Sequence, residues 1–402
     1  MATQTTPVPA SLVKEDSPVV VYLDHILTEA VKLGASDLHF EPFEHHYRVR
    51  LRIDGELREM PSPAKALKDK LASRIKVLSQ LDIAEKRLPQ DGRMQLPMPA
   101  GLALDLRVST LPTLFGEKIV IRILSSNSGG WGIDELGYRD EEKSRLLKAI
   151  HQPHGMVLVT GPTGSGKTQS LYACLNVLNA PEVNIATVED PCEIHLPGVN
   201  QVNVHDKAGL TFAVALRAFL RQDPDVLMVG EVRDLETADI AIKAAQTGHL
   251  VLSTLHTNDA PSALTRLRNM GIAPYNIVSS VALITAQRLV RRLCPHCKQA
   301  SAIEPQWLHQ AGLAERFWQE AHCTYQPVGC DQCHKGFSGR TGIFQVMPVS
   351  DVMADLILQE ASTQAIALQA QREGVLTLRQ SGLIKVVQGI TSVQEVLSAT
   401  SA

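Results

Sequence analysis

Aromatic residues, long apolar runs and a strong net charge are all scarce or missing in this chain. Phe, Trp and Tyr make up 4% of its 402 residues, and the formal net charge is −3. Nucleic-acid binders use basic surfaces and aromatic side chains that stack on bases, so this composition disfavours that class of protein. The longest apolar run, 277–290, is interrupted by polar residues and is shorter than the roughly 18–20 residues of a membrane span. The N-terminus also lacks the basic region and apolar core of a secretory signal, so we expect a cytosolic protein.

The cysteines do not follow the pattern of a disulfide scaffold. Four of the seven form two C-x₂-C pairs, Cys294 with Cys297 and Cys330 with Cys333. Two thiolates three residues apart can share one tight turn, and two such turns complete a tetrahedral Zn²⁺ site with Zn–S distances of ~2.3 Å. Because cysteine would fill all four positions, we predict a structural zinc, with a small subdomain between the two pairs.

The first 124 residues are predicted to contain a polar tail and a small α+β domain. Residues 1–16 are rich in Pro and Thr, which is typical of disorder. A helix is expected from Pro18 until Gly34, because apolar residues recur there at helical spacing. Apolar residues then alternate at period two over 47–53, 102–108 and 119–123, and Asp54-Gly55 is a hairpin signal. We therefore predict a domain over 17–124, followed by a linker over 125–135 that begins with Ser, Asn and Gly.

Beyond the linker, short apolar runs alternate with helical segments. The predicted strands are 156–160, 184–188, 226–229 and 250–254. Strands separated by helices imply right-handed crossovers and a largely parallel sheet. Together with the phosphate-binding loop described next, this pattern predicts a RecA-like α/β core over 136–290. The cysteine-rich subdomain is predicted over 291–345 and a helical subdomain over 346–402.

A phosphate-binding loop follows the first of these strands. Backbone N–H groups must wrap a triphosphate, and three glycines supply conformations and clearances that a Cβ would block. The following helix directs its free N–H groups at the phosphates. Lys167 is predicted to reach the β- and γ-phosphates, and the Thr168 hydroxyl to bind Mg²⁺. The residues predicted to contact ATP or GTP are Gly161, Pro162, Thr163, Gly164, Ser165, Gly166, Lys167 and Thr168.

Acidic residues follow two other predicted strands. The strand 226–229 resembles a Walker B segment, but Gly230 stands where that motif usually has an Asp, and Glu231 follows as the candidate general base. The missing carboxylate has to come from elsewhere. Glu189, Asp190 and Glu193 follow the strand 184–188, so they should emerge at the same sheet edge as the loop, where ligands bind in open α/β sheets.

Histidines and arginines offer further candidates that spacing alone does not resolve. His249 and His256 bracket one apolar strand and either sense the γ-phosphate, link it to a neighbouring subunit, or are structural. A guanidinium often stabilises the charge of phosphoryl transfer. The candidates are Arg217 and Arg221, four apart on a predicted helix, and Arg107 and Arg122, on two strands of the N-terminal domain; solvation remains the alternative for each of them.

Taken in order, these segments resemble the ATPases of type II secretion and type IV pilus assembly. The resemblance runs from about residue 17 through nearly the whole chain and includes the phosphate-binding loop and both cysteine pairs. Its other motifs are 35–42, 50–55, 89–93, 107–110, 116–118, 189–191, 220–225, 230–234, 247–249, 253–256, 339–342 and 377–379.

The resemblance implies roles that spacing does not supply. In this family the acids at 189–193 form an Asp box, His249 and His256 a His box, and arginines matching Arg107 and Arg122 reach the nucleotide when a PAS-like N-terminal domain closes over the core. These ATPases work as homo-hexameric rings at the cytoplasmic face of the inner membrane. They use ATP and Mg²⁺ to extrude pilin-like subunits through a polytopic inner-membrane partner, with no specific nucleic acid.

Two departures from the family pattern affect the expectations. The separate N-terminal docking domain of many relatives is not seen before the PAS-like segment, so membrane recruitment is expected to differ. Gln345 stands where relatives commonly carry Glu. The four cysteines favour assembly or secretion motors over pilus-retraction ATPases, but whether the machine is a secretion, type IV or competence pilus stays open.

Three other classes of protein remain as alternatives. A nucleic-acid motor of RecA type would share the loop, the Glu and the arginines, and DNA-stimulated hydrolysis would identify it. A conjugation-type ATPase is disfavoured by the paired cysteines. A non-catalytic scaffold is disfavoured because Lys167, Thr168 and Glu231 are all present.

Overall fold

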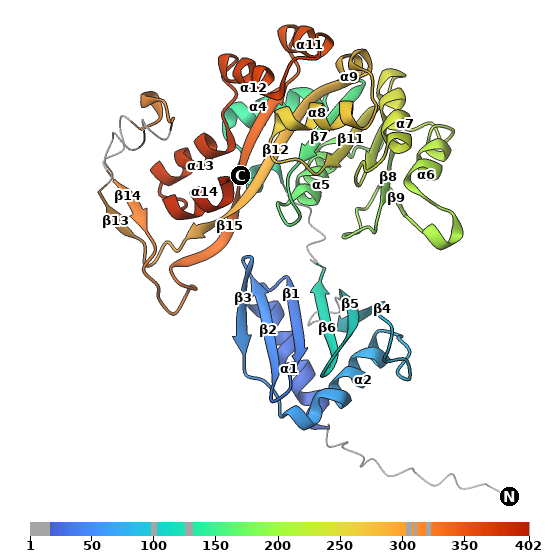
Figure 1. Ribbon diagram of the computed structural model, residues 1–402, viewed down its shortest axis with the longest axis vertical. Coiled ribbons are helices and arrows are strands. Elements are labelled where there is room, and N and C mark those ends of the chain that lie inside the picture. Colours follow the sequence, from blue (N-terminus) through green and yellow to red (C-terminus); the bar gives the residue numbers. More distant parts are fainter. Residues whose placement is uncertain are drawn as a thin grey trace, which may run out of the picture. The chain divides into compact units, whose positions relative to one another are not determined.

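The computed structural model describes residues 17–97, 103–124, 132–302, 308, 312–318 and 323–401. The chain divides into two compact units, Met1–Ser126 and Asn127–Ala402 (Figure 1). The predicted tail at 1–16 and residues 125–131 of the predicted linker lie outside the described residues. Each unit is therefore considered by itself.

The first unit is a six-stranded antiparallel sheet with helices on one face. Its strand order is β3-β2-β1-β6-β5-β4, and the predicted hairpin at Asp54-Gly55 is confirmed, with φ of 50° and 89°. Alternate side chains, such as Leu38, Val49 and Ile121, are fully buried in one core, so the other face of the sheet carries the polar residues. The elements are α1 (Pro18–Lys32), β1 (Asp37–Pro42), β2 (Tyr47–Ile53), β3 (Glu56–Met60), η1 (Lys65–Leu67), α2 (Lys68–Leu78), β4 (Gln90–Pro97), β5 (Ala103–Thr113) and β6 (Gly116–Ile123).

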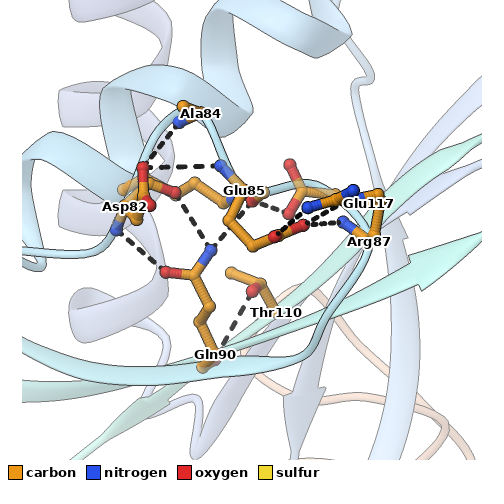
Figure 2. Close-up of polar contacts among 8 residues, drawn as sticks. Asp82, Ala84, Glu85, Arg87, Gln90, Thr110 and Glu117 are labelled. Atoms are coloured by element: carbon orange, nitrogen blue, oxygen red, sulfur yellow. Dashed lines mark hydrogen bonds and ion pairs between the residues drawn. The ribbon is translucent and has the colours of Figure 1, made fainter.

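A polar network shapes the loop between α2 and β4 (Figure 2). The Asp82 carboxylate accepts from the Ala84 amide at 2.8 Å, and the Gln90 side-chain oxygen accepts from the Asp82 amide at 2.8 Å. Lys76 of α2 donates to the Glu85 carbonyl at 2.6 Å and forms a buried ion pair with Glu117 of β6 at 2.5 Å. These contacts hold the loop against α2 and β6 just before β4, which pairs with β5.

The second unit is built on a seven-stranded sheet of order β15-β12-β7-β11-β10-β8-β9. Every pair from β12 to β9 is parallel, as the alternation of strands and helices predicts, and β15 is antiparallel to β12. The central strands β7, β8, β10 and β11 are buried along their whole length because helices cover the sheet. The elements up to β12 are α3 (Ile133–Leu136), α4 (Asp140–Ile150), β7 (Gly155–Thr160), α5 (Lys167–Leu178), β8 (Ile185–Glu189), β9 (Asn200–Asn203), η3 (Asp206–Ala208), α6 (Phe212–Phe219), β10 (Val226–Val229), α7 (Leu235–Gln246), β11 (Leu250–Leu255), α8 (Ala260–Asn269), α9 (Pro274–Ser280) and β12 (Val281–Leu293).

The cysteine segment emerges from two long strands of this sheet. β12 and β15 (Phe337–Pro348) pair from Leu283 to Leu293, and both strands extend across the predicted boundaries at 290 and 345. Between them lie β13 (Gln299–Ser301), η4 (Glu315–Phe317) and β14 (Thr324–Gln326). The chain then forms α11 (Asp351–Leu358), α12 (Thr363–Arg372), α13 (Leu378–Val387) and α14 (Val393–Thr400).

Candidate nucleotide site and cysteine cluster

The glycine-rich loop joins β7 to α5 as the sequence predicts. Gly164 and Gly166 adopt φ of 78° and 87°, and a Cβ on Gly164 would meet nothing within 4 Å, so the loop is open at this point. Lys167 begins α5, and its Nζ donates to the carbonyls of Gly161 at 2.9 Å and Pro162 at 3.1 Å. Burial lowers the pKa of Lys167, while Glu231 acts in the opposite direction.

These residues fit a triphosphate and its metal ion. The Lys167 ammonium is satisfied only by neutral carbonyl oxygens of its own loop among the contacts described, and a phosphate is a better partner for it. The Ser165 hydroxyl is buried without a hydrogen-bond partner among the described residues. Thr168 is the second residue of α5, where its hydroxyl suits a Mg²⁺ ligand and the helix N–H groups suit phosphate oxygens.

Glu231 is held from two sides just beyond the carboxyl end of β10. One carboxylate oxygen forms an ion pair with Arg233, and the other lies 3.3 Å from His256 Nε2. The Arg233 guanidinium also lies 3.8 Å from Asp190. His256 follows β11, whose last residue, Leu255, pairs with Thr160 at the start of the phosphate-binding loop. The candidate general base therefore lies at the same sheet edge as that loop.

A steric constraint explains why a glycine, and not an Asp, precedes Glu231. A Cβ on Gly230 would lie 3.3 Å from the Cα of Glu189 and 3.3 Å from the carbonyl oxygen of Val188. The Gly230 amide also donates to that carbonyl at 2.8 Å. β8 therefore approaches β10 too closely for the Asp that usually occupies this position without some adjustment.

The three predicted acids after β8 have different environments. Glu189 is 4% exposed, and its carboxylate accepts from Tyr172 of α5, from Thr187 at 2.7 Å and from Gln201 at 3.3 Å. Asp190 is partly exposed beside Arg233, and Glu193 lies on the surface. The carboxylate of Glu189 thus ties β8 to the loop helix, whereas Asp190 is the acid that faces the Glu231 cluster.

The structure does not bring every predicted residue to this cluster. His249 precedes β11, and its Nδ1 lies 3.0 Å from the carbonyl oxygen of Ala244, so His249 and His256 sit at opposite ends of the strand. Arg217 of α6 pairs with Glu236 of α7 at 2.7 Å, and Arg221 donates to the Arg217 carbonyl at 2.7 Å. The nucleotide roles of these residues stay predictions.

Three arginines form a row on the polar face of the first unit. Arg93, Arg107 and Arg122 are direct cross-strand neighbours on β4, β5 and β6, although like charges directly opposite each other destabilise a sheet. Arg122 also forms an ion pair with Asp37 of β1 at 2.9 Å, a partner that its own strand did not reveal. The three arginines line a cavity of about 360 Å³ together with Asp91, Gly92, Val108, Ser109 and Val120.

The four paired cysteines meet in space. Their Sγ atoms all lie within 4.8 Å of one another, with separations of 3.9 Å for Cys294 to Cys330, 3.6 Å for Cys297 to Cys333 and 3.6 Å for Cys330 to Cys333. A tetrahedron with Zn–S bonds of ~2.3 Å has edges of about 3.8 Å. The donor set and its spacing therefore fit a zinc ion.

Sequence reasoning missed several polar residues that the fold brings to the site. Arg233 stands inside the motif that supplied Glu231, and Tyr172 lies in an apolar run of α5. Gln287 and Arg288 lie on β12, where Gln287 contacts the phosphate-binding loop and Arg288 donates to the Asn258 carbonyl at 3.0 Å. For Gln287 and Arg288, the signal in the sequence was that polar residues interrupt the apolar run at 277–290.

Comparison with known proteins agrees with these features. Residues 13–398 match the family model described as Type II/IV secretion system protein. The type IV pilus assembly ATPase PilB of Acinetobacter baylyi is 55% identical over 96% of this chain and 67% of its own length. The PilB of Pseudomonas aeruginosa is 53% identical over 99% of this chain and 70% of its own. The type II secretion system ATPase E of Vibrio cholerae is 48% identical over 96% and 76%.

Solved structures support the fold. The Legionella pneumophila ATPase DotB has a TM-score of 0.69 at 20% identity, with 96% of each chain covered. The pilus retraction motor PilT with bound ADP has a TM-score of 0.63 at 24% identity, covering 94% of this chain and 97% of its own. The predicted family, RecA-like core and ATPase activity are thereby confirmed. The chain belongs to the type II/IV secretion system protein family and is an ATPase of that family.

Proposed function

We propose that this ATPase forms a homo-hexameric ring that drives the assembly of pilin-type filaments at the cytoplasmic face of the inner membrane. The observation that carries the proposal is the identity of 55% and 53% to two type IV pilus assembly ATPases over nearly the whole chain. The position of Glu231 at the same sheet edge as the phosphate-binding loop supports hydrolysis. A type IV pilus is the favoured machine, because two of the PilB relatives are 55% and 53% identical, whereas the type II secretion proteins of Dickeya dadantii and Vibrio cholerae are 49% and 48% identical. No helix among the described residues is long and apolar enough to cross a membrane. The proposal includes a polytopic inner-membrane partner, as the family resemblance implies.

The residues of the core have separate tasks in hydrolysis. The loop amides and Lys167 hold the phosphates, and Thr168 and Asp190 are the residues that would hold Mg²⁺. When bound, the ion would supply charge neutralisation for the phosphates. Glu231 orients the attacking water and accepts its proton, and His256 and Arg233 fix the direction of its carboxylate. Glu189 supports this edge from behind through Tyr172.

The remaining predicted residues act when parts of the ring come together. Arg107 and Arg122 meet the γ-phosphate when the first unit closes over a nucleotide. Arg217, Arg221 and His249 contribute from a neighbouring subunit, because Arg217 is half exposed and His249 lies at the far end of β11. The four cysteines hold a structural Zn²⁺ that orders the segment between β12 and β15.

Deletion and complementation in the source bacterium test the machine. We expect the deletion strain to lose surface pili and to regain them with the parental gene but not with a Glu231→Gln allele. Normal piliation with lost protein secretion would assign the chain to a type II system instead. Purified protein whose hydrolysis rises strongly with added DNA would favour the nucleic-acid motor and contradict the proposal.

A further inference from the structure

We propose that Gln287 is a positioning residue for nucleotide binding, which holds the phosphate-binding loop in its binding shape. Gln287 lies on β12, the strand parallel to β7 on the side away from β11. Its neighbour Ala286 pairs with Thr160, the last residue of β7. Gln287 therefore lies beside the end of β7, where the phosphate-binding loop begins.

Both ends of the Gln287 amide contact the loop and its helix. Nε2 donates to the carbonyl of Ser165 at 2.7 Å, and Oε1 accepts from the hydroxyl of Ser170 at 2.7 Å. The carbonyl of Ser165 can only accept, so the amide nitrogen must face it and the orientation of the amide is determined. Gln287 is 2% exposed, and Ser165 and Ser170 are 3% and 1% exposed, so water does not replace these contacts at low cost.

Two loop glycines make room for Gln287. A Cβ on Gly161 would lie 2.6 Å from the backbone oxygen of Gln287, which no real Cβ tolerates. A Cβ on Gly166 would lie 3.2 Å from Gln287 Nε2, at a residue whose φ of 87° already favours glycine. These glycines therefore accommodate the β12 contact as well as a phosphate.

The two contacts of Gln287 fix the direction in which the backbone amides of the phosphate-binding loop point. One side chain spans from Ser165, inside the loop, to Ser170, in the first turn of α5, and so fixes both ends of the segment that presents Lys167 and Thr168. A loop that is already in its bound shape does not lose conformational freedom when a nucleotide arrives. A purely structural glutamine, in contrast, would change stability without changing nucleotide affinity.

The test replaces Gln287 with Met, which keeps the length of the side chain and removes both hydrogen bonds. We expect the Kd for ADP with Mg²⁺ and the KM for ATP to rise about tenfold, with a smaller change in kcat. The matched control is Gln345→Met, since Gln345 is a buried glutamine on the adjacent strand whose Oε1 accepts from the Ala260 amide of α8 at 3.0 Å. Its Kd for ADP should stay within about twofold of the parental value. Equal losses of affinity in the two variants, or none in either, would overturn the proposal.

A second variant gives a pH-dependent change in KM that a folding defect would not produce. In Gln287→Glu the carboxylate still accepts from Ser170 but donates to the Ser165 carbonyl only when it is protonated. The ratio of its KM for ATP to the parental KM should therefore fall as the pH is lowered from 8 to 6. A ratio that does not change with pH would show that the donation to Ser165 has no part in nucleotide binding.

Discussion

At the scale of single residues, the site depends on how Glu231 is held. A general base works only when its lone pair points at the water it activates. Arg233 contacts one carboxylate oxygen of Glu231 and His256 contacts the other, so the carboxylate group does not rotate freely. The neighbouring Glu231 carboxylate raises the pKa of Arg233, so the guanidinium stays charged beside the candidate base.

The first prediction separates nucleotide binding from hydrolysis. Glu231→Gln keeps the shape of the side chain but removes the base, so turnover should fall about 10²–10⁴-fold while the Kd for ATP is retained. Lys167→Ala removes the cation that reaches the phosphates, and it should abolish binding or turnover. Nucleotide titration and a phosphate-release assay on the same preparations check both. Parental turnover in Glu231→Gln would exclude it as the base.

Residues within a contiguous motif were the easiest to predict. The phosphate-binding loop and the C-x₂-C pairs have fixed spacings, because their chemistry lies within a few residues of one turn. The contacts of Glu231 with His256, and of Gln287 with Ser165, join different strands. They depend on the strand order of the sheet, which periodicity does not supply.

At the scale of elements, β12 connects the phosphate-binding loop with the cysteine cluster. The sequence patterns indicated these as two separate sites. Its middle lies beside the phosphate-binding loop, and its end leads directly into Cys294. The amides of Leu293 and Cys294 donate to the Ile390 and Gly336 carbonyls, each at 2.8 Å. These bonds tie the end of β12 to the turn between α13 and α14 and to Gly336, just before β15, next to the cysteine cluster, so loss of the cluster should loosen this corner.

The second prediction concerns zinc. Purified protein should contain about one Zn²⁺ per chain, bound as a closed four-thiolate site. Cys330→Ser combined with Cys333→Ser should lose the metal and lower the thermal unfolding midpoint, because the ligands would no longer cross-link the segment. Cys323→Ser is the control, since Cys323 lies outside the cluster. Elemental analysis that finds undiminished zinc in the double variant would contradict the assignment.

The third prediction concerns a buried lysine that joins three elements. Lys385 of α13 donates to the Gly137 carbonyl at 2.5 Å and to Thr341 of β15 at 3.0 Å. Burial lowers its pKa from 10.5 to about 8. Between these two values the unfolded chain binds more protons than the folded one, so the contribution of Lys385 to the free energy of unfolding should increase with pH.

Thermal unfolding between pH 7 and 9.5 measures this effect. The parental protein should gain stability from pH 8 upward relative to Lys385→Met, which has no titrating group at that position. Identical pH profiles for the two proteins would show that burial does not shift the pKa of Lys385.

At the scale of the whole molecule, the sequence predicts individual strands and helices better than it predicts the contacts between them. Period-two patterns located β2, β5 and β6 of the first sheet, because burial on one face imposes that period, and short apolar runs located β7, β8, β10 and β11 of the second. The long strands β12 and β15 were not predicted. The row formed by Arg93, Arg107 and Arg122 appears only when β4, β5 and β6 are paired in register. Three guanidinium groups side by side repel one another, and Asp37 pairs with one of them, so an anion that meets the row is a prediction to be tested.

The last prediction tests whether that anion is the nucleotide on the core. A ligand shifts an equilibrium only by its different affinity for the two states, so closure of the first unit must gain contacts that exist only with ATP bound. Arg107→Ala and Arg122→Ala should each lower turnover at least about tenfold under ring-forming conditions, as arginines that stabilise phosphoryl transfer do. Zinc content should remain parental. Arg122→Ala also removes the ion pair with the buried Asp37, so its turnover is compared at a temperature at which unfolding measurements show it to be folded. Arg87→Ala is the control because Arg87 is exposed and paired only with the nearby Glu85 in the ion pairs described. If both variants hydrolyse ATP at the parental rate, Arg107 and Arg122 are ordinary surface residues and this closure mechanism is wrong.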